Sequence, residues 1–236
     1  MSFRLVLFDV DGTLLRAGGA GRWAMARAIE QVFGLPDADP FTHPVRFEGN
    51  TDPGILAEIA HNAAIPQEEL RRRAAEIQQA FLGHLEARLR AAPAPQALPG
   101  VMDLLDRLAP VSIAGVGLLT GNVRAGAMLK LASVALDRYF TLGGFGEDAP
   151  DRAGIGMVAR QRFQESLHRG IEPQEVFAIG DSAEDIRAAK TNGFRSISVG
   201  TGWTDPDLLR SLEPDLFVDD LSDYGSLMQF IFGSKG

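Results

Sequence analysis

The sequence predicts an α/β protein with a parallel β-sheet, helices on both faces of it, and a helical segment inserted after the first strand. An apolar run opens the chain at residues 4–9, and beyond residue 100 short apolar runs alternate with longer amphipathic stretches. These two observations predict the sheet. Residues 16–92, by contrast, look helical throughout, and this third observation predicts the insertion.

The later strands are predicted from short apolar runs that end at Leu119, at Ile179, at Val199 and near Val218. Between and after these runs the pattern predicts helices at about 122–133, 152–168, 183–192, 204–212 and 223–232. Such alternation of strand and helix is typical of a parallel sheet whose two faces are both covered.

The insertion contains two predicted amphipathic helices. Each has a set of residues on one helical face: Met25, Ile29, Val32 and Phe33 in the first, and Leu70, Ala74, Ile77, Phe81 and Leu85 in the second. Pro66 suits the first turn of the second helix. The chain passes between the core and the insertion at two crossings, near residues 14–20 and 92–99. These are rich in glycine and proline respectively, as expected of a pair of hinges. We therefore predict a core of residues 1–15 and 96–236 and a helical domain of residues 16–95.

Composition excludes several classes of site and partner. The chain has 236 residues, 45% of them hydrophobic, which is enough for a good core. It lacks cysteine, which excludes disulfides and thiolate metal sites. Its net charge of -8 argues against nucleic acid or an anionic membrane as a partner. Neither a signal peptide nor a membrane-spanning run is recognisable, so we expect a cytoplasmic protein, as a monomer or homodimer. The run 71–73 of arginines lies among glutamates and favours a solvated helix face.

Three predicted strands are followed by residues suited to chemistry. The first strand leads into Asp9-Val10-Asp11-Gly12-Thr13. The second is followed by Thr120-Gly121-Asn122, and the third by Gly180-Asp181-Ser182 through to Asp185. Ligands of open α/β sheets bind at the carboxyl ends of the strands, so we expect these groups to meet there.

Each residue type has a physical role in such a site. Clustered carboxylates without nearby histidine or cysteine suit Mg²⁺, and hydroxyls and free N–H groups at a helix start suit phosphate oxygens. One carboxylate can attack phosphorus, and a second, two residues away, can protonate the leaving oxygen and later activate water. Singly, these motifs also fit a turn or a helix cap. Together they favour phosphoryl-transfer chemistry.

The three motifs, in this order, resemble those of the haloacid dehalogenase superfamily of phosphatases and related hydrolases, and most closely those of its phosphoglycolate phosphatase-like branch. The resemblance implies a Rossmann-like core with a helical cap domain. It implies that Asp9 is the nucleophile, that Asp11 is the general acid and base, and that Thr120 and the Gly121 N–H hold phosphoryl oxygens. The implied Mg²⁺ ligands are Asp9, the Asp11 carbonyl, Asp181 and Asp185, and the further substrate-binding positions are Gly12, Thr13 and Asn122.

One element of the family pattern is missing. The family's third motif is a lysine before the fourth motif, but none of the three lysines, Lys130, Lys190 and Lys235, lies between Phe140 and Gly180. Arg152 is the cation best placed to substitute, and Arg124 is its rival. Alternatively, Arg152 pairs only with Asp148 or Asp151 at the surface.

The sequence thus predicts a Mg²⁺-dependent phosphatase that acts on a small phosphorylated metabolite through an aspartyl-phosphate intermediate. A phosphomutase of the same superfamily and a non-catalytic phosphate-binding module remain as alternatives. Arg22 and Arg46 are candidates for holding a substrate carboxylate, although either could simply be a solvated charge. The stretch from Gly115 to Thr120 starts like a dinucleotide-binding fingerprint, but Thr120 stands at the position of its last glycine.

Overall fold

The main sheet has six parallel strands in the order β5-β4-β1-β6-β7-β8, in a computed structural model that describes residues 3–35, 45–91 and 93–233. The predicted α/β class is confirmed. The strands are β1 (Arg4–Phe8), β4 (Ala114–Leu119), β5 (Gly143–Gly144), β6 (Val176–Gly180), β7 (Arg195–Val199) and β8 (Leu216–Val218). Because the strand order reverses at β1, a crevice is expected at the carboxyl end of that strand.

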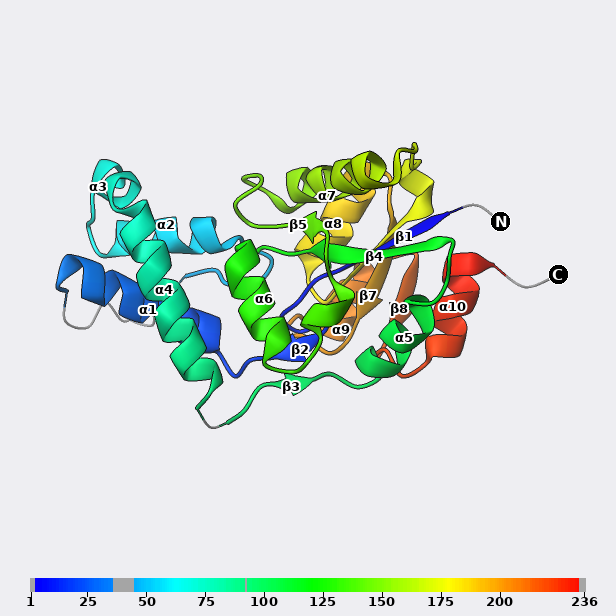
Figure 1. Cartoon of the computed structure of the whole chain (residues 1–236), viewed down its shortest axis with the longest axis horizontal. Coiled ribbons are helices and arrows are strands. Elements are labelled where there is room, and N and C mark those ends of the chain that lie inside the picture. Colours follow the sequence, from blue (N-terminus) through cyan, green and yellow to red (C-terminus); the bar gives the residue numbers. More distant parts are fainter. Residues whose placement is uncertain (1–2, 36–44, 92, 234–236) are drawn as a thin grey trace.

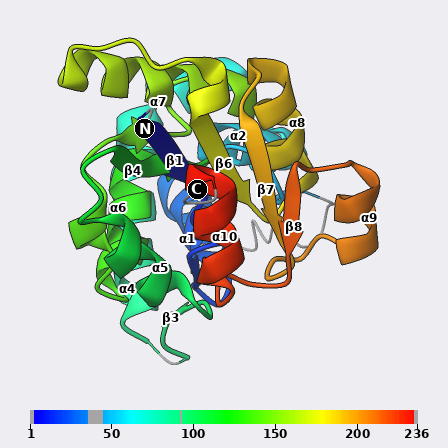
Figure 2. The ribbon, with the colours of Figure 1, turned by 90° about the vertical axis from the view of Figure 1, so that its right-hand side faces the viewer.

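Both faces of the sheet are covered because β1 is apolar from Leu5 to Phe8 and alternates its side chains between the faces. Leu5 and Leu7 pack under α7 (Arg152–Leu167) and α8 (Ala183–Asn192), whereas Val6 and Phe8 face α5 (Val101–Leu108) and α10 (Tyr224–Phe232). Figures 1 and 2 show these two helix pairs on opposite sides of the sheet. α9 (Pro206–Ser211) and two short 3₁₀ helices, Asp137–Tyr139 and Pro173–Glu175, complete this part of the chain.

The two glycines at the centre of β4 serve packing. A Cβ on Gly117 would lie 2.5 Å from the ring of Phe163, and one on Gly115 would lie 3.3 Å from the same ring. Phe163 of α7 therefore rests directly on the backbone of β4. This close approach of helix and strand accounts for the glycines that resemble the start of a dinucleotide-binding motif.

Four helices, α1 (Ala20–Phe33), α2 (Asp52–Asn62), α3 (Gln67–Arg72) and α4 (Ala74–Leu89), form a group beyond one end of the sheet (Figure 1). We call them the cap helices. Their apolar faces pack together and against α6 (Arg124–Ala132) of the core. Gly126 is a point of close approach, because a Cβ there would lie 3.3 Å from the ring of Phe81 on α4.

The insertion is less helical than predicted. Leu15–Arg16 (β2) pairs antiparallel with Gln96–Ala97 (β3), so a small two-stranded sheet joins the two crossings. Residues 45–50 are not helical, and residues 36–44 lie outside the described ranges. The second predicted helix is two helices, interrupted at Arg73, and Ala74 is exposed rather than on the buried face. The predicted buried positions of α1 and α4, among them Ile29 and Phe81, are confirmed.

Two core elements lack a sequence signal that we recognised. β5 consists of two glycines, which carry no apolar pattern, and α5 follows Pro99-Gly100 where a return to the sheet was expected. Pairing with Leu118 and Leu119 of β4 creates β5, which is a tertiary effect. Among the helices that the structure describes, none is long and apolar enough to cross a membrane.

Candidate active site

The first acidic motif follows β1 directly. The Asp9 amide donates to the Ile179 carbonyl at 2.9 Å, which continues the sheet pairing and buries the Asp9 side chain. Gly12 then turns the chain with φ of +86°, a conformation that favours glycine. A Cβ on Gly12 would lie 2.4 Å from Asp181 Oδ2. Glycine at this position therefore lets the loops after β1 and β6 approach each other.

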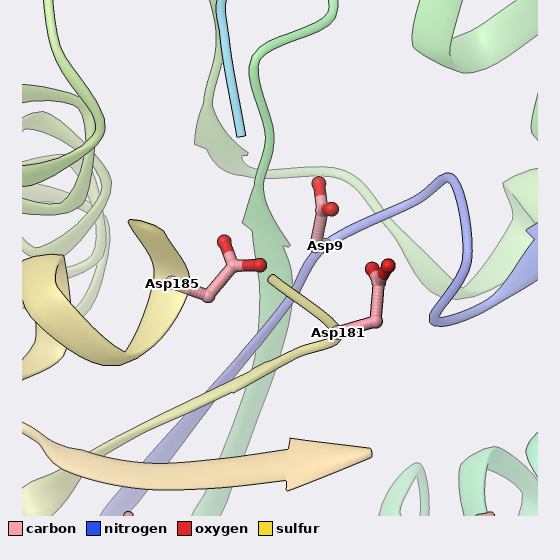
Figure 3. A group of neighbouring side chains, drawn as sticks. All are labelled: Asp9, Asp181 and Asp185. Carbon is pink, nitrogen blue, oxygen red and sulfur yellow. The ribbon is translucent and has the colours of Figure 1, made fainter. Parts of the chain in front are cut away.

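Three buried carboxylates, those of Asp9, Asp181 and Asp185, offer oxygens that all lie within 4.8 Å of one another. Figure 3 shows them around a shared space, Asp9 beyond β1, Asp181 beyond β6, and Asp185 in the first turn of α8. The Thr13 hydroxyl donates to Asp181 Oδ1 at 3.0 Å. Ser182 holds Asp185 Oδ2 through its hydroxyl at 2.6 Å and its amide at 3.1 Å, in the capping box that starts α8.

Arg152, the first residue of α7, reaches back over the carboxyl edge of the sheet and is 6% exposed. Its Nη1 lies 3.1 Å from Asp9 Oδ1 and 3.3 Å from the Leu119 carbonyl, and its Nε lies 3.3 Å from Asp185 Oδ1. The surface alternative is wrong, because Asp148 pairs with Arg162 at 2.6 Å and Asp151 caps α7.

Arg124 lies elsewhere. Its guanidinium lies 5.3 Å from the centre of the Phe145 ring, and its Nη2 donates to the Thr141 carbonyl at 3.3 Å. The residue is exposed at the start of α6, so Arg152 is the arginine that contacts the acidic cluster.

The cluster carries more negative charge than Arg152 neutralises. Burial raises the pKa of Asp9 to about 6, although Arg152 opposes the shift. Burial, together with the Asp9 and Asp185 carboxylates, raises the pKa of Asp181 well above its ordinary value. Oxygen-only donors that are buried close together and short of positive charge match the ligand preference of Mg²⁺.

The stretch after β4 does not cap a helix, because α6 begins at Arg124 with Val123 as its N-cap. Thr120 is fully buried, and its hydroxyl accepts from the Asn122 side-chain nitrogen at 2.9 Å. A Cβ on Gly121 would lie 2.1 Å from the Asn50 carbonyl oxygen. Gly121 is thus the point where the loop before α2 presses on the core.

Lys130 is a residue of this region that the sequence analysis did not select. It is 4% exposed, and its Nζ lies 2.5 Å from Asp11 Oδ2 and 2.6 Å from Asn122 Oδ1. A signal was present, because Lys130 is four residues after Gly126 and three after Ala127, on the buried face of α6.

A cavity of about 550 Å³ lies between this edge of the sheet and the cap helices. Its core wall includes Asp9, Asp11, Gly121, Asn122, Lys130, Arg152 and Asp181, and its other wall includes Arg22, Met25, Phe47 and Ile55. The predicted site residues Gly12, Thr13, Thr120 and Asp185 are not among the residues that line this cavity. Arg16, Asp52 and the 62% exposed Trp203 also line the cavity, and the sequence analysis missed all three.

The two arginines proposed for a substrate carboxylate differ in position. Arg22 lines the cavity, with its guanidinium 4.4 Å from the centre of the Phe47 ring. Arg46 does not line it and instead pairs with Glu184 of α8 at 2.6 Å, which links the segment before α2 to the core. Of the two, only Arg22 is placed where it could meet a ligand in this cavity.

A family model described as haloacid dehalogenase-like hydrolase matches residues 3–193. The chain belongs to this family. The predicted family and enzyme class, a hydrolase, are therefore confirmed. A non-catalytic module is correspondingly disfavoured, since the acidic residues of this hydrolase also meet in one buried cluster.

Two curated relatives of this haloacid dehalogenase-like hydrolase align over nearly its full length. It is 27% identical over 226 residues to a phosphoglycolate phosphatase of Chromobacterium violaceum, covering 96% of each chain. It is 28% identical over 225 residues to a phosphoglycolate phosphatase of Agrobacterium fabrum, covering 92% of this chain and 89% of the relative.

Solved structures share its fold. A predicted phosphoglycolate phosphatase from Haemophilus somnus superposes with a TM-score of 0.68 at 20% identity, covering 97% of this chain and 99% of that one. CbbY from Rhodobacter sphaeroides, in complex with phosphate, also gives 0.68 at 19% identity, covering 94% and 96%. At these identities the likeness concerns the fold alone.

Proposed function

We propose that this hydrolase is a Mg²⁺-dependent phosphatase that cleaves a small phosphate monoester of the phosphoglycolate type through an aspartyl phosphate on Asp9. The observation that carries the proposal is the buried cluster of Asp9, Asp181 and Asp185, with Arg152 against it, at the floor of a cavity. The curated relatives named phosphoglycolate phosphatase support the substrate class.

Asp9, Asp181, Asp185 and the backbone carbonyl of Asp11 would hold the Mg²⁺. The donor set fits the ion, because the carboxylates are hard oxygen ligands, buried close together, with pKa values of Asp9 and Asp181 raised by burial. When bound, the ion would neutralise part of the charge of the phosphoryl group and of the carboxylates around it.

The chain's own residues would act in two steps. In the first, an Asp9 carboxylate oxygen forms a bond to phosphorus while the bond from phosphorus to the ester oxygen breaks, and protonated Asp11 gives its proton to that leaving oxygen. In the second, the Asp11 carboxylate takes a proton from water, the water oxygen bonds to phosphorus, and the bond to Asp9 breaks. Inorganic phosphate leaves, and Asp9 and protonated Asp11 are regenerated.

Arg152 would serve both steps from its place beside Asp9. Its guanidinium contacts the Asp9 carboxylate and the Leu119 carbonyl, so its charge is fixed before substrate arrives. A cation held in this way lowers the repulsion between an anionic nucleophile and an anionic phosphate without having to reorganise during the reaction. It would therefore supply the charge that the family's lysine provides.

The proposal is tested with purified protein, para-nitrophenyl phosphate and phosphoglycolate, each with Mg²⁺ and with EDTA. Both esters should be hydrolysed only with the metal, and Asp9→Asn should abolish turnover while Asp103→Asn, at an exposed carboxylate of α5, leaves it unchanged. Hydrolysis in EDTA, or full activity of Asp9→Asn, would contradict the mechanism. Turnover of the aryl ester without turnover of phosphoglycolate would contradict only the substrate class.

A further inference from the structure

Lys130 is buried at the junction of core and cap, where an uncompensated charge would be costly. Its side chain is 5% exposed, and a Cβ on Gly21 at the start of α1 would lie 3.2 Å from its Nζ. Buried lysines are rare unless they are paired. The carboxylates of Asp11 and Asp52 raise the pKa of Lys130 against the effect of its burial, so it carries a full positive charge.

The contacts of Lys130 form a closed set with Asp11 and Asn122. Nζ donates to Asp11 Oδ2 at 2.5 Å and to Asn122 Oδ1 at 2.6 Å. Asn122 in turn donates from Nδ2 to the same Asp11 oxygen at 2.9 Å. Because Lys130 occupies the amide oxygen, the Asn122 amide has its nitrogen directed at Asp11. Two donors thus converge on Oδ2, and Oδ1 is the Asp11 oxygen that these contacts leave for another partner.

The two buried cations that line the cavity divide the carboxylates between them. Arg152 lies against Asp9 and Asp185, on the side where the metal ligands gather. Lys130 lies against Asp11, which is less buried, with 29% of its side chain exposed, and which follows the end of β1 in a loop. Such contacts keep a carboxyl group in a loop in one orientation, since its side chain can otherwise exchange between several staggered rotamers.

We propose that Lys130 is a positioning residue that acts through Asp11: together with Asn122 it fixes the orientation in which Asp11 transfers a proton. This inference rests on the proposed phosphatase function. When Asp11 gives its proton to the leaving oxygen it becomes a carboxylate, and Lys130 and Asn122 already offer donors to that charge. The interaction is therefore in place before the proton moves.

The test uses the dependence of kcat/KM on the leaving group, because kcat/KM reports the first chemical step and a general acid matters most when the leaving oxygen is basic. The substrates are para-nitrophenyl phosphate, phenyl phosphate and an alkyl phosphate, measured with Mg²⁺. Lys130→Met should lower kcat/KM by less than about threefold for the nitrophenyl ester and by about 100-fold for the alkyl ester, within the range of general-acid contributions. Lys130→Arg, which keeps the charge but moves the donor, should fall between wild type and Lys130→Met.

Two controls separate positioning from a merely structural role. Lys190→Met, at the exposed lysine of α8 whose Nζ donates to the Leu212 carbonyl, should leave the whole series unchanged. In an Asp11→Asn background, Lys130→Met should cause no further loss on phenyl phosphate, because the group through which it acts is gone. Thermal melting is recorded for every variant. If Lys130→Met does not fold, Lys130→Arg takes its place in the same measurements.

Equal losses across the three esters, or a full further loss in the Asp11→Asn background, would overturn the positioning role. Unchanged kcat/KM for the alkyl ester in Lys130→Met would overturn it as well. Absence of hydrolysis by the wild-type protein would instead overturn the proposed function, and this inference with it. The two failures are therefore distinguishable.

Discussion

Replacing Arg152 by alanine removes the cation that lies between Asp9 and Asp185 at the end of the sheet. Its Nη1 is 3.1 Å from one carboxylate and its Nε is 3.3 Å from the other, and the guanidinium is buried. Breaking a buried ion pair by removing one partner costs about 3–5 kcal/mol of folding stability, because the other charge stays buried without compensation. We expect a loss of this size in EDTA and a smaller one with Mg²⁺, which supplies the missing positive charge.

The same substitution should slow catalysis by at least about tenfold in kcat, which is roughly 1.4 kcal/mol of barrier. Arg152 lowers the pKa of Asp9 against the effect of burial, and the resulting value is about 6. Without Arg152, the anionic nucleophile and the anionic phosphate lose a fixed positive charge that offsets their repulsion. Arg152→Lys should recover part of the loss, because it restores the positive charge. The recovery should be incomplete, since one ammonium group cannot contact Asp9 and Asp185 through two separate nitrogens.

The assay is steady-state turnover of para-nitrophenyl phosphate with saturating Mg²⁺, accompanied by urea unfolding with and without metal. Arg124→Ala is the matched control, because Arg124 also stands at the start of a helix after a strand but lies over the Phe145 ring. Normal turnover of Arg152→Ala together with an inactive Arg124→Ala would refute the reasoning. Equal destabilisation of Arg152→Ala in EDTA and in Mg²⁺ would refute the charge argument.

Three further outcomes are expected. Gly121→Ala should destabilise the protein by about 1–3 kcal/mol in urea unfolding, because its Cβ would lie 2.1 Å from the Asn50 carbonyl; a change below about 0.5 kcal/mol would contradict the close approach. Burial raises the pKa of Asp52 from 3.8 to about 6, so the folded state holds this proton where the unfolded state has released it, and stability falls as pH rises from about 4 to about 7. Asp52→Asn should reduce that fall by about 1–3 kcal/mol in EDTA, and an unchanged pH dependence would count against the shift. Arg22→Ala should raise KM for phosphoglycolate at least about tenfold more than for a neutral ester, and equal effects on both would remove its role with a substrate carboxylate.

The α/β class and the three strand ends that carry the chemistry could be predicted from the sequence alone. Both depend on local information. A buried strand needs a continuous apolar run, as in β1, and the residues just beyond it, such as Asp9 and Asp181, are set by chain connectivity. Because parallel strands share one carboxyl edge, the order of motifs along the chain was enough to predict that these carboxylates meet, and they lie within 4.8 Å.

Arg152 shows how far such local reasoning extends. Its place at the start of a helix that follows the sheet predicted a side chain that reaches back over the edge, and the structure has it 3.1 Å from Asp9. The choice against Arg124 needed the structure, because both arginines begin helices and only their distances from the cluster differ.

The partners of Lys130, the contact of Gly121 with Asn50, and the strands β2, β3 and β5 depend on the folded arrangement and could not be predicted from the sequence. The buried face of α6 can be predicted from the sequence. No pattern near Lys130 in the chain indicates that its partner is Asp11, which is 119 residues away. The short strands carry no apolar pattern of their own, since β5 is two glycines paired with Leu118 and Leu119. In each case the free energy comes from a contact between distant segments, and such a contact exists only once the helices and strands have packed.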